Sequence, residues 1–133
     1  MITYIHNTTI LVSDQEAALD FYVNTLGWEK RIDEQMSPTY RFLTVAPPGS
    51  QTELALGPVS VLGGEPGEGI VRADTGMEGR SGITFAVENV EETYRTLKER
   101  GVRFSGEPQP MPWGDRATWL FDPDGNGFFF TGR

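Results

Sequence analysis

The pattern of apolar and polar residues begins with a strand that leads directly into an amphipathic helix. Residues 4–12 are rich in Thr, Ile and Val, the β-branched residues that favour strands. Ser13 and Glu16 have the spacing of a capping box, which predicts that a helix starts there. Gly27 suits the left-handed conformation that often ends a helix. Between these signals lies one apolar stripe at helical spacing: Ala17, Ala18, Phe21, Tyr22 and Leu26.

The same order of signals returns in the second half of the chain. Residues 82–87 predict a strand, and Asn89 predicts a helix N-cap with Glu92 three residues on. Gly101 closes this helix as Gly27 closes the first. The apolar stripe of the second helix comprises Val90, Tyr94 and Leu97. A repeat of both order and spacing indicates two duplicated modules.

Each module continues with three further strands, so each has the order β-α-β-β-β. In the first module the expected strands are 28–32, 40–46 and 51–56, with a polar turn at 33–38. In the second they are 102–105, 116–121 and 127–131, with an irregular stretch at 106–114 and a turn at 122–125. The glycine-rich residues 59–80 predict a linker that could include a short strand at 59–62.

Length and composition limit the possible classes of protein. A chain of 133 residues is the size of one domain, here with module one at 1–58, the linker at 59–80 and module two at 81–133. The absence of cysteine excludes disulfides, thiolate zinc sites and thiol nucleophiles. A net charge of −8 argues against a nucleic-acid partner. No signal-peptide pattern and no membrane-spanning run is present, so we expect a cytoplasmic protein with no membrane partner.

Three stretches resemble a known superfamily. HNTTILVSDQEAALDFYVNTLGWE is similar to the opening of the vicinal oxygen chelate superfamily, which includes glyoxalase I, extradiol dioxygenases and bleomycin-binding proteins. GITFAVENVEETYRTLKERGVRF resembles the start of its second module, and FDPDGNGFFF resembles its closing motif. The resemblance implies an α+β fold in which two βαβββ modules pair into an incomplete barrel around a concave cavity. It also implies a homodimer, but not a particular reaction.

The resemblance also identifies four positions at which metal-dependent members carry ligands. In this chain they are Asn7, Glu53, Gly82 and Phe129. Only Glu53 is a good ligand, because an Asn carbonyl is weak and Gly and Phe side chains cannot coordinate a metal. We therefore expect no metal and no other cofactor.

Strand alternation predicts which residues line the cavity. If the side chain of Asn7 faces the cavity, alternation also turns toward the cavity a set of mostly small or polar side chains with one aromatic ring. Such a wall leaves room for a small molecule. The expected wall is Asn7, Thr9, Glu53, Ala55, Gly82, Thr84, Ala86, Phe129 and Thr131. The opposite face is bulky and suits burial under the helices: Ile83, Phe85, Val87, Phe128 and Phe130. Trp113, in an irregular loop, is either an aromatic lid over the cavity or a surface residue.

Two ionisable residues have more than one interpretation. His6 is the only histidine, and alternation turns it away from the cavity, which favours a packed or rim position over a ligand or general base. Glu53 in a cavity without a metal needs a cationic ligand, an arginine partner or a proton. Arg41 and Arg116 are the candidate partners.

These patterns favour a small-molecule binding protein of the bleomycin-resistance type that holds a planar or cationic ligand without a metal. The expected ligand contacts are Asn7, Thr9, Glu53, Thr84, Trp113 and Phe129. Two alternatives remain open. One is a lyase, isomerase or dioxygenase with an unusual metal set that includes Glu53, and the other is a catalytically silent or regulatory partner.

Overall fold

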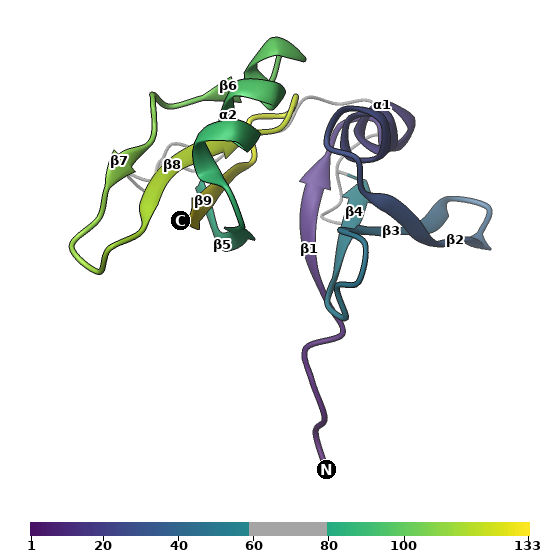
Figure 1. Ribbon diagram of the computed structural model, residues 1–133. Helices are drawn as coiled ribbons and strands as arrows, with labels where there is room; N and C mark the ends of the chain where they lie inside the picture. Colours follow the sequence, from purple (N-terminus) through teal and green to yellow (C-terminus); the bar gives the residue numbers. More distant parts are fainter. Residues whose placement is uncertain (59–79) are drawn as a thin grey trace. The chain divides into compact units, whose positions relative to one another are not determined.

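A computed structural model describes residues 1–58 and 80–133, which fall in two compact units, Met1–Val71 and Arg72–Arg133 (Figure 1). Each unit is considered separately below. The predicted linker, except for Arg80, and the possible strand at 59–62 lie outside the described residues.

The first unit has the predicted β-α-β-β-β order. Its strands form one sheet, here called sheet A, in the order β1-β4-β3-β2. Strands β1 and β4 are parallel, whereas β3 is antiparallel to both of its neighbours. The elements are β1 (Asn7–Val12), α1 (Gln15–Asp20), the π-helical turn η1 (Phe21–Thr25), β2 (Glu29–Ser37), β3 (Tyr40–Ala46) and β4 (Glu53–Pro58).

Helix α1 starts one residue later than the capping-box pattern predicts. The N-cap is Asp14, whose Oδ1 accepts hydrogen bonds from the backbone N–H groups of Glu16 at 2.9 Å and Ala17 at 3.1 Å. The prediction of Ser13 as the cap was wrong because Ser and Asp are adjacent and both cap well. The helical segment ends as predicted before Gly27, which has φ of 81°.

Strand β2 is longer than predicted. It extends to Ser37, so the polar stretch 33–38 that we expected to be a turn is mostly strand, and only Pro38 and Thr39 form the hairpin turn. Two register shifts interrupt its pairing with β3. Its last five residues are exposed, so no buried face produces an alternating pattern there.

The second unit repeats the topology of the first. Its sheet, here called sheet B, has the order β5-β9-β8-β6, again with first and last strands parallel, and a short strand β7 pairs with β8. Asn89 caps α2 as predicted, since its side chain accepts a hydrogen bond from the N–H of Glu92 at 3.1 Å. The elements are β5 (Arg80–Val87), α2 (Val90–Glu99), β6 (Arg103–Phe104), β7 (Gln109–Pro110), β8 (Arg116–Phe121) and β9 (Gly127–Gly132).

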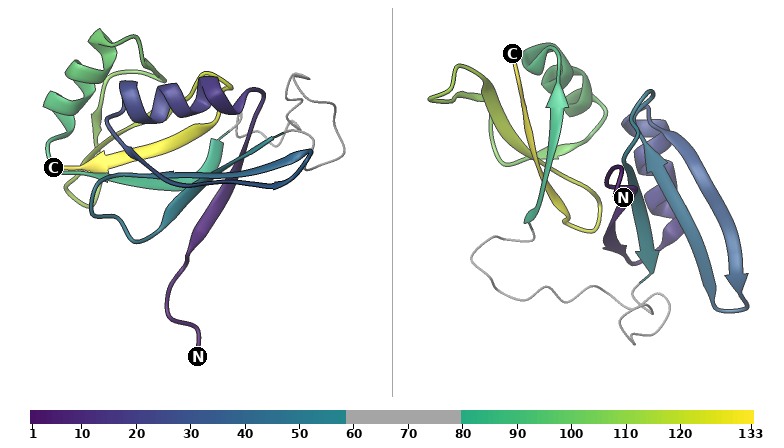
Figure 2. Two further views of the ribbon diagram at one scale, coloured as in Figure 1. Left: turned by 90° about the vertical axis from the view of Figure 1, so that its right-hand side faces the viewer. Right: turned by 90° about the horizontal axis from the view of Figure 1, so that it is seen from below.

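Each sheet carries its helix on one face, as the two views in Figure 2 show. The hydrophobic core of each unit lies between helix and sheet, and the other face of each sheet is here called its open face. On the helix side of sheet A the buried residues are Ile10, Val12, Leu43, Val45, Leu54 and Leu56. On the helix side of sheet B, Phe128 and Phe130 are buried and contact the rings of Phe85 and Phe104.

A buried aspartate fixes the turn between β8 and β9. Asp122 Oδ1 accepts from the backbone N–H groups of Asp124 at 3.0 Å and Asn126 at 2.8 Å, and Oδ2 accepts from the Asn126 side chain at 2.8 Å. Both side chains are almost fully buried. The turn sets where β9 begins, and thereby which of its residues reach the open face.

No helix in the described part of the chain is both long enough and apolar enough to cross a lipid bilayer.

Candidate functional site

The open face of sheet A brings together several residues that the sequence assigns to the cavity wall. Asn7 pairs in register with Glu53, and Thr9 pairs with Ala55. Because β1 and β4 are parallel neighbours, these pairs lie side by side on one face. Thr44 of β3 pairs with Ala55, so it belongs to the same face.

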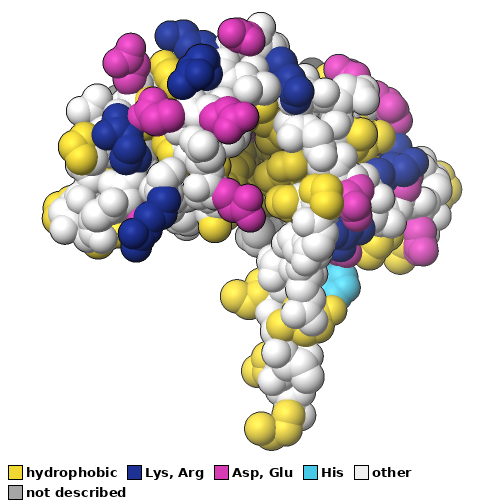
Figure 3. All heavy atoms as spheres, viewed as in Figure 1, with side chains coloured by type: hydrophobic (Ala, Val, Ile, Leu, Met, Phe, Trp, Pro, Cys, Tyr) yellow, Lys and Arg dark blue, Asp and Glu magenta, His cyan; other side chains and the backbone are white. Residues whose placement is uncertain are grey.

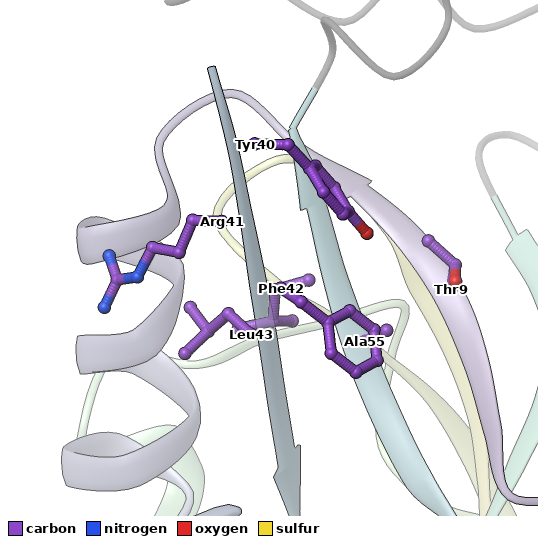
Figure 4. A pocket seen from close by; sticks show the side chains of 8 residues that line it. Thr9, Tyr40, Arg41, Phe42, Leu43 and Ala55 are labelled. Carbon is purple, nitrogen blue, oxygen red and sulfur yellow. The ribbon is translucent and has the colours of Figure 1, made fainter. Parts of the chain in front are cut away.

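A pocket of about 160 Å³ lies on this face. In Figure 4 the rings of Tyr40 and Phe42 lie beside Ala55 and Thr9, whereas Leu43 points toward α1. The lining also includes Gly57, where an added Cβ would approach Thr9 Cγ2 to 2.9 Å. An apolar cavity of about 150 Å³ holds one benzene molecule, so this pocket has the size of a single aromatic ring.

The Glu53 carboxylate is held by other side chains of the same sheet. Its Oε1 accepts a hydrogen bond from the hydroxyl of Thr44 at 3.0 Å, and its Oε2 lies 3.8 Å from Nη1 of Arg31. The Thr44 hydroxyl in turn accepts from the backbone N–H of Ile32 at 3.0 Å. Arg31 thus supplies the cationic partner that Glu53 was expected to need.

The two arginines suggested as partners of Glu53 were the wrong ones. Arg41 lies on the helix side, where it bonds Asp33 through two nitrogens at 2.7 and 2.8 Å and also reaches Glu16. These hydrogen bonds hold the pKa of Asp33 at about 2 rather than 3.8 and raise the pKa of Arg41. Arg116 bonds Glu91 at 2.5 Å.

The open face of sheet B is aromatic near its centre. Thr84 pairs in register with Phe129, and Phe129 pairs with Trp119. The rings of Trp119 and Phe129 meet edge to face with centroids 5.3 Å apart. The guanidinium carbon of Arg80 lies 4.8 Å from the centroid of the Trp119 ring. Phe129 therefore provides an aromatic surface at one of the four positions where the resemblance places a metal ligand.

Trp113 is placed at the tip of the connection between β7 and β8. Its side chain is 59% exposed, and its Nε1 donates a hydrogen bond to Asp115 at 3.1 Å. This bond fixes the indole ring at the surface of the second unit. Its role as a lid over a ligand stays a prediction.

His6 lies outside the strands, in the N-terminal segment that precedes β1. Its ring is exposed, as the cyan side chain in Figure 3 shows. The side-chain amide of Asn7 donates to its Nδ1 at 2.9 Å, and its backbone oxygen accepts from the N–H of Glu53. Of the packed and rim positions that the sequence left open, the exposure of His6 excludes the packed one.

The residues at the four metal-ligand positions of the superfamily do not fit a metal ion. Asn7 directs its amide to His6, and Glu53 is engaged by Thr44 and Arg31. Gly82 has no side chain and Phe129 contacts another ring. Among the described residues, no three His, Asp or Glu side chains converge in a way that could hold an ion.

Several site residues were not identified from the sequence. Tyr40, Phe42 and Thr44 alternate with the buried Leu43 and Val45, so the alternation of β3 already indicated that they share the open face. The contacts made by Arg31 and Arg80 depend on irregular strand pairing, which leaves no local signal in the sequence.

Comparisons with known proteins agree on one family. The sequence-family model of the Glyoxalase/Bleomycin resistance protein/Dioxygenase superfamily matches residues 4–130 of this chain. YetH of Bacillus subtilis strain 168 is 32% identical over 128 residues, which cover 96% of this chain and 97% of YetH.

Two solved structures are also similar. A superfamily member from Sphaerobacter thermophilus DSM 20745 is 52% identical, with a TM-score of 0.86 and coverage of 99% of this chain and 98% of that one. TnmS3, an antibiotic binding protein from Streptomyces sp. CB03234, is 32% identical, with a TM-score of 0.77 and coverage of 98% and 96%. The predicted α+β fold of two βαβββ modules is confirmed.

Proposed function

Because this chain belongs to the glyoxalase/bleomycin resistance protein/dioxygenase superfamily, we propose that it is a metal-independent protein that binds and sequesters a planar small molecule. The observation that carries the proposal is the ring-sized pocket on the open face of sheet A, walled by Tyr40 and Phe42. The small side chains of Thr9 and Ala55 and the absence of a side chain at Gly57 keep the pocket open. The similarity to TnmS3, an antibiotic binding protein, supports an antibiotic as the type of ligand.

Of the two ligand types expected from the sequence, the planar type is favoured over the cationic one. Glu53 is the only acidic residue among the predicted ligand contacts, and its carboxylate is already engaged by the Thr44 hydroxyl and by Arg31, which also pairs with Glu29. The pocket beside it is walled by aromatic rings, which offer stacking to any flat ligand. Thr9 contacts the ligand through this pocket, whereas ligand contact by Thr84 and Phe129, which pair in register on sheet B, stays a prediction from the sequence. For Asn7 and Trp113, ligand contact rests on the sequence alone.

A panel of planar aromatic antibiotics, with one ring and with several, tests the proposal. We expect at least one compound to raise the melting temperature and to bind with one ligand per chain in calorimetry. The bound compound should be recovered chemically unchanged, because the protein sequesters it. If no planar compound binds, or if the compound is converted, the proposal is wrong.

A substitution that fills the pocket links binding to this site. Thr9 is exposed on the open face, so Thr9→Leu adds bulk to the pocket without entering the core. We expect binding to weaken at least about tenfold, because burying one ring contributes on the order of 2 kcal/mol. Thr96→Leu, the same change on the exposed surface of α2, is the matched control and should leave affinity unchanged.

Metal content separates this function from the enzyme alternative. Protein purified without an affinity tag and then offered zinc, manganese, iron or nickel should retain far less than one ion per chain. Retention of one ion, together with its release by Glu53→Gln, would favour a metal-dependent lyase, isomerase or dioxygenase instead.

The homodimer and the cytoplasmic location predicted from the sequence belong to the same proposal. Light scattering of the purified protein should give twice the mass of one chain. A monomer would contradict the dimer prediction without affecting the pocket.

A further inference from the structure

Strands β3 and β4 are neighbours in sheet A, but they pair over only part of their length. Thr44 pairs with Ala55 and Val45 with Leu54, and no other pair links these two fully described strands. Strand β3 nevertheless begins at Tyr40, and β4 continues to Pro58. The two strands therefore separate toward this end of the sheet.

The side-chain amide of Gln15 lies in the gap between the two strands. Its Nε2 donates one hydrogen bond to the backbone oxygen of Arg41 at 2.9 Å and one to the backbone oxygen of Leu56 at 3.0 Å. A primary amide has two N–H groups, so each carbonyl receives one of them. Gln15 is the first residue of α1 and directly follows the N-cap Asp14, so the cap fixes the position from which this side chain starts.

Pro58 explains why a side chain, and not the neighbouring strand, supplies the donor for Arg41. Continued beyond Thr44 and Ala55, the register would set Leu43 opposite Leu56 and Arg41 opposite Pro58. Proline has no backbone N–H, so it cannot donate to the Arg41 carbonyl. Gln15 supplies that donor, and it also engages the Leu56 carbonyl, which would otherwise be free to accept from Leu43. One side chain thus takes the place of two ladder bonds.

The pocket on the open face of sheet A extends to this gap. Its lining combines open-face side chains such as Phe42 and Ala55 with Leu43 and Leu56, whose side chains are buried on the helix side. In Figure 4 the Phe42 ring lies beside Ala55, whereas Leu43 points toward α1. Paired strands lie only about 4.8 Å apart, which leaves no opening that residues of both faces could line. The separation of β3 from β4 therefore accounts for the pocket.

We propose that Gln15 is a positioning residue of the ligand site: its amide keeps β3 and β4 apart, and the resulting gap admits one aromatic ring. The inference rests on the proposed function and identifies what gives the pocket its size. Without the two N–H groups of Gln15, Leu43 and Leu56 are free to pair, which brings the strands to about 4.8 Å and closes the gap. Gln15 acts through the backbones of the two strands and does not have to touch the ligand.

Amide hydrogen exchange tests the gap without any ligand. Gln15→Met keeps the length of the side chain and deletes both N–H groups. We expect the backbone amide of Leu43 or Leu56 to exchange at least about tenfold more slowly in this variant, because a ladder bond forms between the strands. The loss of a purely structural contact would make exchange faster, so the direction of the change distinguishes the two roles.

Phenol, a single aromatic ring, is the probe for the pocket itself. We expect NMR titrations that follow the Ala55 methyl group to show at least about fivefold weaker phenol binding in Gln15→Met than in the wild type, because a closed gap no longer buries the ring. Gln15→Lys keeps N–H donors on a stem of similar length, so it should keep most of the affinity. Gln51→Met makes the same change in the exposed connection between β3 and β4, and this matched control should bind phenol as the wild type does.

The outcomes separate the role of Gln15 from the proposed function. Unchanged amide exchange or unchanged phenol affinity in Gln15→Met, or an equal loss of affinity in Gln15→Lys, would overturn the role of Gln15 and leave the proposed function intact. If neither phenol nor any planar antibiotic binds to the wild type, the proposed function is wrong, and amide exchange still decides whether Gln15 separates the strands. If Gln15→Met does not fold, Gln15→Glu replaces it, since a carboxylate has the same shape and no donor at neutral pH.

Discussion

The hydroxyl of Thr44 links the bulge in β2 to the carboxylate of Glu53, and removing it should destabilise the first unit. Thr44 is fully buried. Its oxygen accepts from the Ile32 N–H and donates to Glu53, each at 3.0 Å. Thr44→Val keeps the shape of the side chain and deletes both hydrogen bonds.

The expected cost of Thr44→Val follows from these two bonds. An orphaned buried N–H costs about 1–3 kcal/mol. The lost bond to the carboxylate adds roughly 1 kcal/mol, because Glu53 is partly accessible and water can replace the hydroxyl there. The free energy of unfolding should therefore fall by about 2–4 kcal/mol.

Urea denaturation at neutral pH measures this change, with the slope of the transition expected to stay constant. Thr44→Ser is the control, since it keeps the hydroxyl and loses one methyl group, at a cost of about 1 kcal/mol. A double-mutant cycle with Glu53→Gln then isolates the bond between the two side chains. If Thr44→Val is as stable as Thr44→Ser, the Thr44 hydroxyl does not stabilise the bulge in β2, and its hydrogen bond to Glu53 contributes nothing to stability.

Two further predictions concern the helix start and the acid stability of the first unit. Asp14→Ala should lower the free energy of unfolding by about 1 kcal/mol through loss of the N-cap, and a larger effect of Ser13→Ala in the same urea titration would contradict the assignment of the cap. Arg41 holds the pKa of Asp33 at about 2. The stabilisation that this ion pair gives the folded state is therefore present above pH 3.8 and is lost as the pH falls through 2. Asp33→Asn should therefore flatten the loss of stability between about pH 4 and pH 2 relative to the wild type. Glu34 is a neighbouring, exposed carboxylate, so Glu34→Gln should leave this loss of stability unchanged. If the free energy of unfolding falls with pH at the same slope in the wild type and both variants, the role given to Arg41 is refuted.

The elements that could be predicted from the sequence are those with a local signal. Strand β8 has the predicted bounds 116–121, because it contains the strand-forming residues Thr118, Trp119 and Phe121 and is bounded by breakers. Helix α2 starts at the predicted cap because Asn89 has no competing neighbour. Strand β2 was underestimated because its outer half is exposed on both faces and therefore carries no alternation.

The candidate site could be predicted only in part, because it depends on which strands pair and in what register. The placement of Asn7 beside Glu53 agrees with the expected wall, since both residues stand on regular strands. The ion partner of Glu53 was missed because Arg31 lies at a register shift, where counting by twos fails. The contact of Gln15 with β3 and β4 was missed because it depends on where the two strands separate, which no local pattern specifies.

Two of the positions at which the resemblance places metal ligands are shaped by their surroundings as well as by their donor atoms. At Gly82 the backbone has φ of 79°, a conformation that residues with a side chain rarely adopt. Substituting a histidine there would strain the strand, and it would not by itself restore the donor that metal-dependent relatives carry. At Phe129 the ring packs against Trp119, so a carboxylate there would give up that aromatic contact. At Gly82 and Phe129 the surroundings therefore favour the residues that are present over a metal ligand. This is the pattern expected when a scaffold keeps its fold and exchanges its chemistry.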